Sequence, residues 1–186
     1  MRSLNLSRGS SRRDRRYSLI GCAVGILVSD TSVLIDLERG DLLETALRSR
    51  LELVVPDVLY RQEIEPYSGD RWTAWGLAVI ELSPMEAEHG QDYLSRDPAL
   101  SVPDAFALAL ARDRAWTLVT GDRRLRQMAQ AEVVPVHGLL WLVEQLASDG
   151  VDSALLSAGL TRVLDHPLCR LPRPDAGRLL ARLRAR

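Results

Sequence analysis

The chain has 186 residues, of which 46% are hydrophobic and 26% are charged. These values exclude an intrinsically disordered chain, and the length fits one globular domain with tails. The net charge of -1 is unevenly spread, because residues 1–29 hold six Arg and one Asp, and residues 165–186 hold six Arg and two Asp. The acidic segment between them repels nucleic acid unless metal ions or the Arg-rich ends offset its charge. The only two cysteines, Cys22 and Cys169, indicate neither a disulfide framework nor a thiolate metal site, and we expect a cytoplasmic protein.

The first 29 residues combine a basic segment with an apolar one. Residues 11–16, SRRDRR, precede the apolar residues 17–28, YSLIGCAVGILV, in an order that resembles a twin-arginine or secretory signal. The apolar residues are too few for a transmembrane helix and run directly into the segment after Asp30. We therefore expect residues 25–28 to form the first strand of the domain and residues 1–24 to be a disordered basic extension.

Short apolar runs then alternate with segments of helical periodicity. The runs expected to be strands are residues 26–28, 51–55, 77–82, 115–120 and 133–136. The segments expected to be helices are residues 31–37, 41–50, 57–65, 84–94, 101–114, 123–130 and 139–147. This alternation predicts an α/β fold, a three-layer α/β/α arrangement with a central parallel sheet of about five strands. We expect the domain to span residues 25–148 and residues 149–186 to form a helical C-terminal extension, in which LLARLRAR is either a docking or RNA-contact helix or a plain amphipathic end.

Four acidic residues lie near the predicted carboxyl ends of strands. Asp30 follows the first strand and Asp122 the fourth, whereas Glu63 lies in the helix after the second strand and Asp104 in the first turn of the helix before the fourth. Ligands of parallel α/β sheets bind beyond these ends, so we expect the four carboxylates to converge. Each also has a structural explanation. Asp30 can cap a helix, Asp122 can close a turn, Asp104 can complete a capping box with Ser101, and Glu63 can be solvated.

Clustered carboxylates require cations or protons among them, because two unit charges about 4 Å apart repel by roughly 4 kcal/mol at an effective dielectric near 20. A ligand set made only of oxygen selects hard ions such as Mg²⁺ or Mn²⁺. Such ions suit phosphate-ester hydrolysis, since they activate water and stabilise the departing oxygen. Arg123, Arg124 and Arg126 follow Asp122 and either bind flanking phosphates or form a solvated basic face.

Other common sites are not indicated. The sequence has no nucleoside-triphosphate loop and no dinucleotide-binding glycine motif, and Ser32 lacks the glycine context of a serine hydrolase. The scattered histidines His89, His137 and His166 follow no metal-ligand spacing and are expected at the surface or at helix starts. The remaining acids are expected on exposed helix faces or in strand interiors, and they include Asp36, Glu44, Asp57, Glu81 and Glu144.

Four segments resemble, in order and spacing, motifs of the PIN-domain ribonucleases, and most closely the toxins of VapC type: SDTSVLIDL, VVPDVLYRQEI, LSVPDAFALALA and LVTGDRRL. The resemblance covers roughly residues 26–147 and implies a PIN-like fold. It implies that the catalytic, metal-binding residues are Asp30, Glu63, Asp104 and Asp122, supported by the hydroxyls of Thr31 and Thr120. A further acid found in some members after the fourth motif is replaced by Arg, which leaves open whether one or two ions bind.

The same resemblance implies Mg²⁺- or Mn²⁺-dependent cleavage of single-stranded RNA that leaves a 5′-phosphate. It also implies a homodimer and neutralisation by a small cognate antitoxin protein. Because the apolar stretch before Asp30 is too short to span a membrane, we expect no membrane partner. Two alternatives remain at this point. One is a non-catalytic PIN-like binding module, and the other is a metal-dependent hydrolase that acts on DNA or on other phosphate esters. The intact set of four acids favours an enzyme over the binding module.

Overall fold

The structure is a computed structural model that describes residues 26–185. The extension expected at residues 1–24 lies outside these residues. Within residues 26–185, no helix combines the length and the apolar character needed to cross a membrane.

Five short strands form one parallel sheet in the order β3-β2-β1-β4-β5. They are β1 (Leu27–Ser29), β2 (Leu53–Pro56), β3 (Ala78–Ile80), β4 (Thr117–Val119) and β5 (Val136–His137). All four neighbouring pairs are parallel, and the central strand β1 pairs Val28 with Val54 on one side and with Leu118 on the other. The predicted α/β fold with a parallel sheet of about five strands is confirmed.

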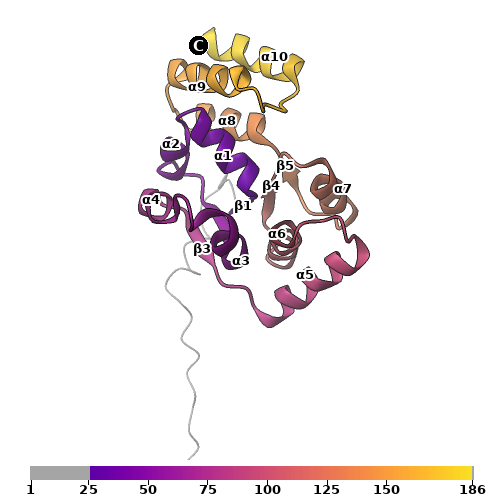
Figure 1. The fold of residues 1–186 in the computed structure, drawn as a ribbon. Helices are drawn as coiled ribbons and strands as arrows, with labels where there is room; N and C mark the ends of the chain where they lie inside the picture. The colour runs from indigo at the N-terminus through magenta and orange to yellow at the C-terminus, as the bar shows by residue number, and fades with distance from the viewer. Residues whose placement is uncertain (1–25, 186) are drawn as a thin grey trace, which may run out of the picture.

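Helices cover both faces of this sheet (Figure 1). In chain order the helices are α1 (Thr31–Arg39), α2 (Leu43–Leu47), α3 (Asp57–Leu59), η1 (Tyr60–Ile64), α4 (Gly69–Trp75), α5 (Pro84–Arg96), α6 (Val102–Asp113), α7 (Arg123–Ala131), α8 (Leu139–Ser148), α9 (Ser153–Asp165) and α10 (Arg173–Arg184). Neighbouring strand residues such as Leu27 and Val28 are fully buried in two different cores, one under α1 and α8 and the other under α5, α6 and α7. Burial on both faces explains why the central strands β1, β2 and β4 are apolar, whereas the outer strands β3 and β5 are partly exposed.

Two elements differ from the prediction. The fifth strand was expected at residues 133–136, but β5 is Val136–His137, because Val133 is 88% exposed and adopts a left-handed φ of 59° just after α7. The short helix α4 was not predicted, since its Gly and Asp start gives little helical signal. Trp72 stabilises α4 by burying its ring in the first core while its indole N–H donates to Glu38 over 3.3 Å.

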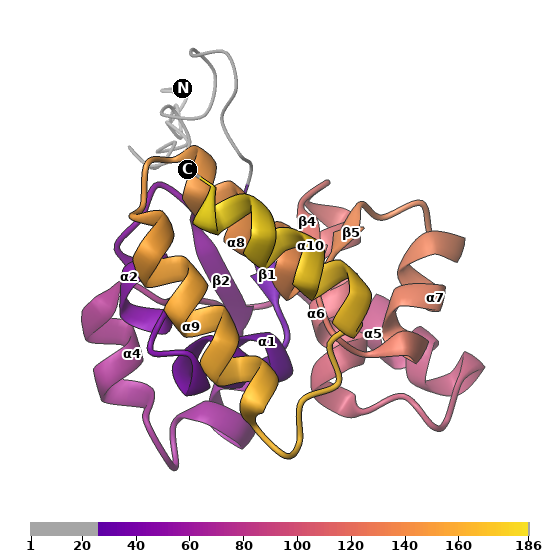
Figure 2. The same ribbon diagram turned by 90° about the horizontal axis from the view of Figure 1, so that it is seen from above.

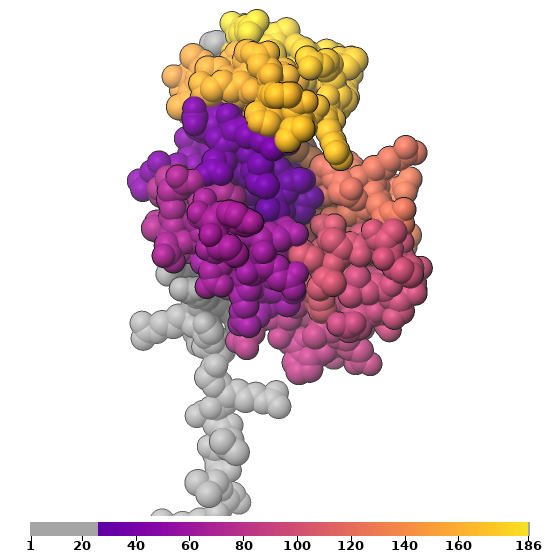
Figure 3. Space-filling model, in the orientation of Figure 1, coloured from indigo at the N-terminus to yellow at the C-terminus, as the bar shows by residue number. Residues whose placement is uncertain are grey.

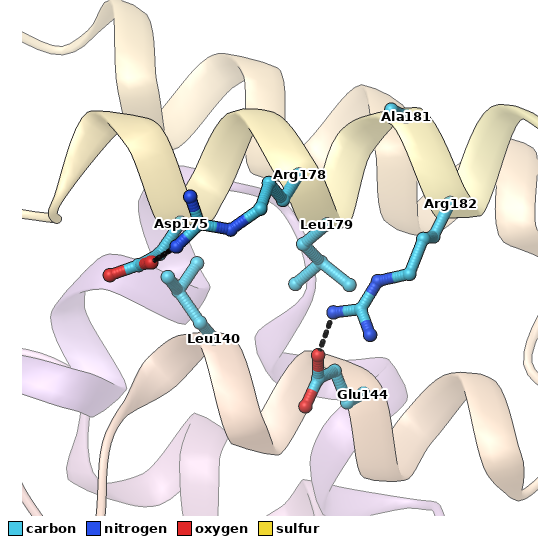
Figure 4. A pocket seen from close by; sticks show the side chains of 7 residues that line it. All are labelled: Leu140, Glu144, Asp175, Arg178, Leu179, Ala181 and Arg182. Atoms are coloured by element: carbon cyan, nitrogen blue, oxygen red, sulfur yellow. Dashed lines mark hydrogen bonds and ion pairs between the residues drawn. The ribbon is translucent and has the colours of Figure 1, made fainter.

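The last two helices pack on α1 and α8 on the side away from the sheet (Figure 1), and Figure 2 shows α9 and α10 running next to each other. In the space-filling view they form a continuous cap over α1 (Figure 3). Leu156 and Leu183 are buried in the same core as α1. Leu179 and Leu140 line a groove of about 490 Å³ between α10 and α8, where Arg182 pairs with Glu144 (Figure 4). The proposed boundary at residue 148 stays a prediction.

Candidate active site

Asp30 connects the end of β1 to the start of α1, and only 3% of the residue is exposed. One carboxylate oxygen accepts the Val33 N–H over 3.0 Å and the Ser32 hydroxyl over 2.9 Å. The other oxygen accepts a hydrogen bond from the Thr120 hydroxyl at the end of β4. Asp30 is therefore a helix cap and also a buried acid at the carboxyl edge of the sheet.

Burial raises the pKa of Asp30 from its usual value of 3.8 to about 6. The hydrogen bonds from Thr120, Val33 and Ser32 lower that pKa and so offset part of the rise, whereas the charge of Asp104 adds to it. The hydrogen bonds from the protein therefore do not fully offset the cost of burying an ionised Asp30 carboxylate. A bound cation would relieve this cost.

Glu63 lies in a π-helical turn. The Glu65 N–H donates to the Tyr60 carbonyl over 2.8 Å, a span of five residues that defines the wider turn. The predicted helix of residues 57–65 is thus a short α-helix followed by η1. The exposed Glu63 carboxylate accepts a hydrogen bond from the Thr31 hydroxyl, which joins the start of α1 to η1.

Asp104 occupies the first turn of α6. The Asp104 N–H donates to the Ser101 hydroxyl over 3.2 Å. The same hydroxyl donates to the Asp104 carboxylate over 2.6 Å. Only half of the predicted capping box is formed at Ser101, whereas the reciprocal bond is present in α5 between Ser83 and Glu86. The Asp104 carboxylate is therefore half-buried and held by a hydroxyl instead of serving as a backbone cap.

Asp122 caps α7 by accepting the Leu125 N–H over 2.7 Å. Its own N–H donates to the Thr120 hydroxyl over 2.9 Å. Because that same hydroxyl donates to Asp30, the fully buried Thr120 links the two acids across neighbouring strands. Unlike Asp30, Asp122 is exposed.

Asp104 lies within electrostatic reach of each of the other three predicted acids. Burial raises the pKa of Asp104 most, and the charges of Asp122 and Glu63 raise it further, while Asp104 in turn raises the pKa of Asp30. In Figure 1 the helices α1, α3 and α6 lie around β1 and β4, the two strands that lead to Asp30 and Asp122. The sequence motifs of four separate elements thus converge at one end of the sheet.

The four carboxylates do not form a ready-made ligand shell. Among the residues that the structure describes, no group of three or more His, Cys, Asp or Glu side chains is arranged to hold a metal ion. Each carboxylate is engaged by a hydroxyl or an amide. The chemistry of the donor set, which is all carboxylate and hydroxyl oxygen, fits a hard divalent cation.

The three arginines after Asp122 have different environments. Arg124 forms an ion pair with Asp97 over 2.6 Å, and Arg123 is exposed. Arg126 donates to the Thr120 carbonyl over 3.1 Å, so it lies beside the acidic residues. Of these three arginines, Arg126 is the one whose hydrogen bond places it at this edge.

The remaining residues singled out from the sequence have structural partners. His89 contacts Asp113 over 2.6 Å, His166 ends α9, and His137 stacks on a tryptophan. Asp57 is not on an exposed helix face as expected, because its side chain is 17% exposed and one oxygen is buried with no partner within the described residues.

Two residues that hold the acids in place carried no such role in the sequence interpretation. They are Ser32, which binds Asp30, and Ser101, which binds Asp104. A signal for Ser32 exists in its position two residues after a capping aspartate, where a hydroxyl reaches back to the carboxylate. For Ser101 the pattern indicated a cap but not the contact between the two side chains.

These features define an α/β protein with an acidic site at the carboxyl edge of its sheet. A family model described as "DUF3368: PIN domain" matches residues 26–173, and the chain belongs to this PIN-domain family. PIN domains are commonly nucleases that use divalent metal ions.

Two solved archaeal structures are similar to the chain. One is a PilT N-terminus domain protein, SSO1118 from Sulfolobus solfataricus P2, with 16% identity, a TM-score of 0.47, and 67% of this chain and 92% of that chain covered. The other is PAE2754 from Pyrobaculum aerophilum, with 18% identity, a TM-score of 0.47, and 69% and 93% covered. A search of curated proteins found no match.

Proposed function

We propose that the protein is a metal-dependent endoribonuclease that hydrolyses phosphodiester bonds of single-stranded RNA. The observation that carries this proposal is the position of Asp104, whose pKa is raised first by burial and then by the charges of Asp122 and Glu63, and whose own charge adds to the rise in the pKa of Asp30. A protein gains no stability from four mutually repelling carboxylates. Their presence at the ligand-binding edge of a parallel sheet supports a role in binding cations and substrate.

The residues that would hold Mg²⁺ or Mn²⁺ are Asp30, Glu63, Asp104 and Asp122. A bound ion would supply activation of water and stabilisation of charge on the departing oxygen. The protein itself orients the ligands, since Thr120 fixes Asp30, Thr31 fixes Glu63, and Ser101 fixes Asp104. Arg126 and Arg123 would attract the phosphates that flank the scissile bond.

The biological context of the proposal comes from the VapC-like motifs. We propose that the enzyme is a homodimeric, cytoplasmic toxin that a small cognate antitoxin neutralises. The nuclease and the toxin are separate statements, because RNA cleavage can be measured on the purified chain whereas a toxin role requires a partner and a growth phenotype.

The substitution Asp104→Asn tests the nuclease. It preserves size and the contact with Ser101 while removing the charge that couples to the other three acids. We expect cleavage of a labelled single-stranded RNA in Mn²⁺ to fall about 100-fold or more, the scale seen when one charge-stabilising group is lost from a hydrolase. Glu44→Gln is the matched control, because Glu44 lies in a half-exposed ion pair with Arg48 on α2 and should leave cleavage unchanged.

Parallel substrates separate the alternatives. Faster cleavage of DNA or of small phosphate esters than of RNA would replace the ribonuclease by another hydrolase. Binding of RNA or protein with no cleavage of any substrate in millimolar Mn²⁺ would support a binding module. Equal RNA cleavage by the parent and by Asp104→Asn would show that these acids are not the catalytic site.

A further inference from the structure

An aromatic pair lies at the end of β5. The ring of His137 stacks on the ring of Trp141, in the first turn of α8, with centroids 4.0 Å apart and planes within 9° of parallel. Both residues are half-buried, so the pair keeps contact with solvent. None of the acidic residues uses this pair as a partner among the described hydrogen bonds.

Backbone contacts place the pair next to the acidic site. β5 pairs with β4 so that His137 lies opposite Val119, and the Thr120 N–H donates to the His137 carbonyl over 3.0 Å. Thr120 is the residue whose hydroxyl binds Asp30. Only β4 therefore separates the strand of His137 from β1, whose end carries Asp30, and the pair lies on the sheet face that α1 and α8 cover.

Arg126 adds a positive charge at the same place. Its guanidinium donates to the Thr120 carbonyl and lies 3.5 Å from where a Cβ on Gly138 would be. Burial and the charge of Arg126 both lower the pKa of His137 below its usual value of 6.5. His137 is therefore uncharged at neutral pH, and the site combines two flat neutral rings with one cation.

We propose that Trp141, His137 and Arg126 bind one nucleotide of the single-stranded RNA beside the acidic site. A nucleobase would extend the ring stack, and Arg126 would contact the adjoining phosphate. Stacking on aromatic rings is how single-stranded nucleic acids are commonly held, because every base has a flat face. The inference rests on the proposed function only in taking RNA as the ligand.

Binding without metal tests this site independently of catalysis. A fluorescein-labelled single-stranded RNA is titrated with the full chain in EDTA, and its anisotropy gives Kd. Trp141→Leu keeps an apolar side chain against the core and should raise Kd at least about fivefold, the loss of one stacked base. Trp116→Leu is the control and should leave Kd unchanged, because Trp116 precedes β4 at the opposite edge of the sheet.

Salt dependence distinguishes stacking from a general loss of structure. For single strands each phosphate contact contributes a slope of about -0.7 in log K against log salt. Arg126→Gln should therefore reduce the slope by about 0.7, whereas Trp141→Leu should weaken binding with the slope unchanged. Trp141→Phe retains an aromatic face and should bind more tightly than Trp141→Leu. It covers the case in which the leucine variant does not fold.

Steady-state cleavage separates this inference from the proposed function. If the chain cleaves RNA, Trp141→Leu should raise KM with little change in kcat, because stacking contributes equally to ground and transition states. A parent that binds RNA through Trp141 but cleaves none in Mn²⁺ would overturn the nuclease and leave this site standing. Unchanged Kd and KM in Trp141→Leu, or no binding of RNA by the parent, would overturn the site.

Discussion

The Thr120 hydroxyl donates a hydrogen bond to the Asp30 carboxylate, 90 residues earlier in the chain. The same oxygen accepts the Asp122 N–H, so its proton is directed at Asp30. A buried carboxylate that loses such a donor pays a desolvation cost of about 1–3 kcal/mol. This contact is therefore one of the bonds that allow an acid to be buried at the end of β1.

We predict that Thr120→Val destabilises the chain by about 1–3 kcal/mol near pH 7.5, since valine has the shape of threonine without the donor. The loss should be smaller near pH 4, where Asp30 carries a proton and its charge needs no partner. Urea unfolding at the two pH values measures the difference. Thr120→Ser keeps the hydroxyl and should behave like the parent. An equal loss in both substitutions would show that packing, and not the hydrogen bond, is responsible.

Asp30→Asn should stabilise the metal-free chain at neutral pH. Since burial raises the pKa of Asp30 from 3.8 to about 6, the folded chain retains a proton that the unfolded chain has released between these values. The contribution of Asp30 to the free energy of unfolding is therefore largest below pH 3.8, and it is lost as the pH rises through about 6. At 1.36 kcal/mol per pKa unit the loss is about 3 kcal/mol at most.

Asparagine still offers an acceptor oxygen to Val33 and is as good a helix cap as aspartate. The measurement is urea unfolding in EDTA at pH 7.5 and near pH 4. A gain at pH 7.5 that shrinks near pH 4 is expected, together with loss of RNA cleavage. Destabilisation at both pH values would contradict the assignment of Asp30 as an under-compensated charge.

Divalent cations should raise the melting temperature of the parent chain. An ion present at 100 times its dissociation constant adds about 2.7 kcal/mol to the free energy of unfolding. Mn²⁺ should therefore raise the melting temperature by several degrees, and Asp104→Asn should reduce that rise. The variant Glu44→Gln should respond as the parent does. A melting temperature that Mn²⁺ leaves unchanged would count against a metal site at these carboxylates.

Gly159→Ala tests how closely α9 packs on the domain. A Cβ at this position would lie 2.5 Å from the Leu42 side chain. Overpacking of this kind costs about 1–3 kcal/mol, and the midpoint of urea unfolding should fall accordingly. Gly177→Ala in α10 is the control, because a Cβ there meets no atom within 4 Å among the described residues. It should be neutral or stabilising by about 0.5–1 kcal/mol.

The sequence predicted the parts of the fold that depend on continuous burial. The central strands β1, β2 and β4 were visible as apolar runs because both of their faces are covered. Asp30, Asp104 and Asp122 were visible as acids next to strand ends or helix starts. The two features that the sequence did not predict, the start of β5 and the helix α4, depend on contacts between distant segments. Val133 is apolar but exposed, and α4 is stabilised by Trp72 and not by its own helical propensity.

The candidate site was predicted in position but not in detail. The spacing of the acids along the chain predicted that they lie at one edge of the sheet, because the carboxyl ends of parallel strands meet at the same edge. It gave no indication that Ser101 would meet the Asp104 side chain or that Tyr60 would begin a π-helix, since these features depend on side-chain orientation and on the path of the backbone. The catalytic roles of the acids stay predictions.

The π-turn of η1 has a consequence for how the chain tolerates change. A π-turn contains one residue more than the α-helical turn that it replaces. Deleting one residue between Tyr60 and Glu63 would restore a regular α-helical turn and change the direction of the Glu63 side chain, which now meets Thr31. The position of Glu63 thus depends on the number of residues in the turn as well as on their identity, and deletion of a single codon would break its contact with Thr31.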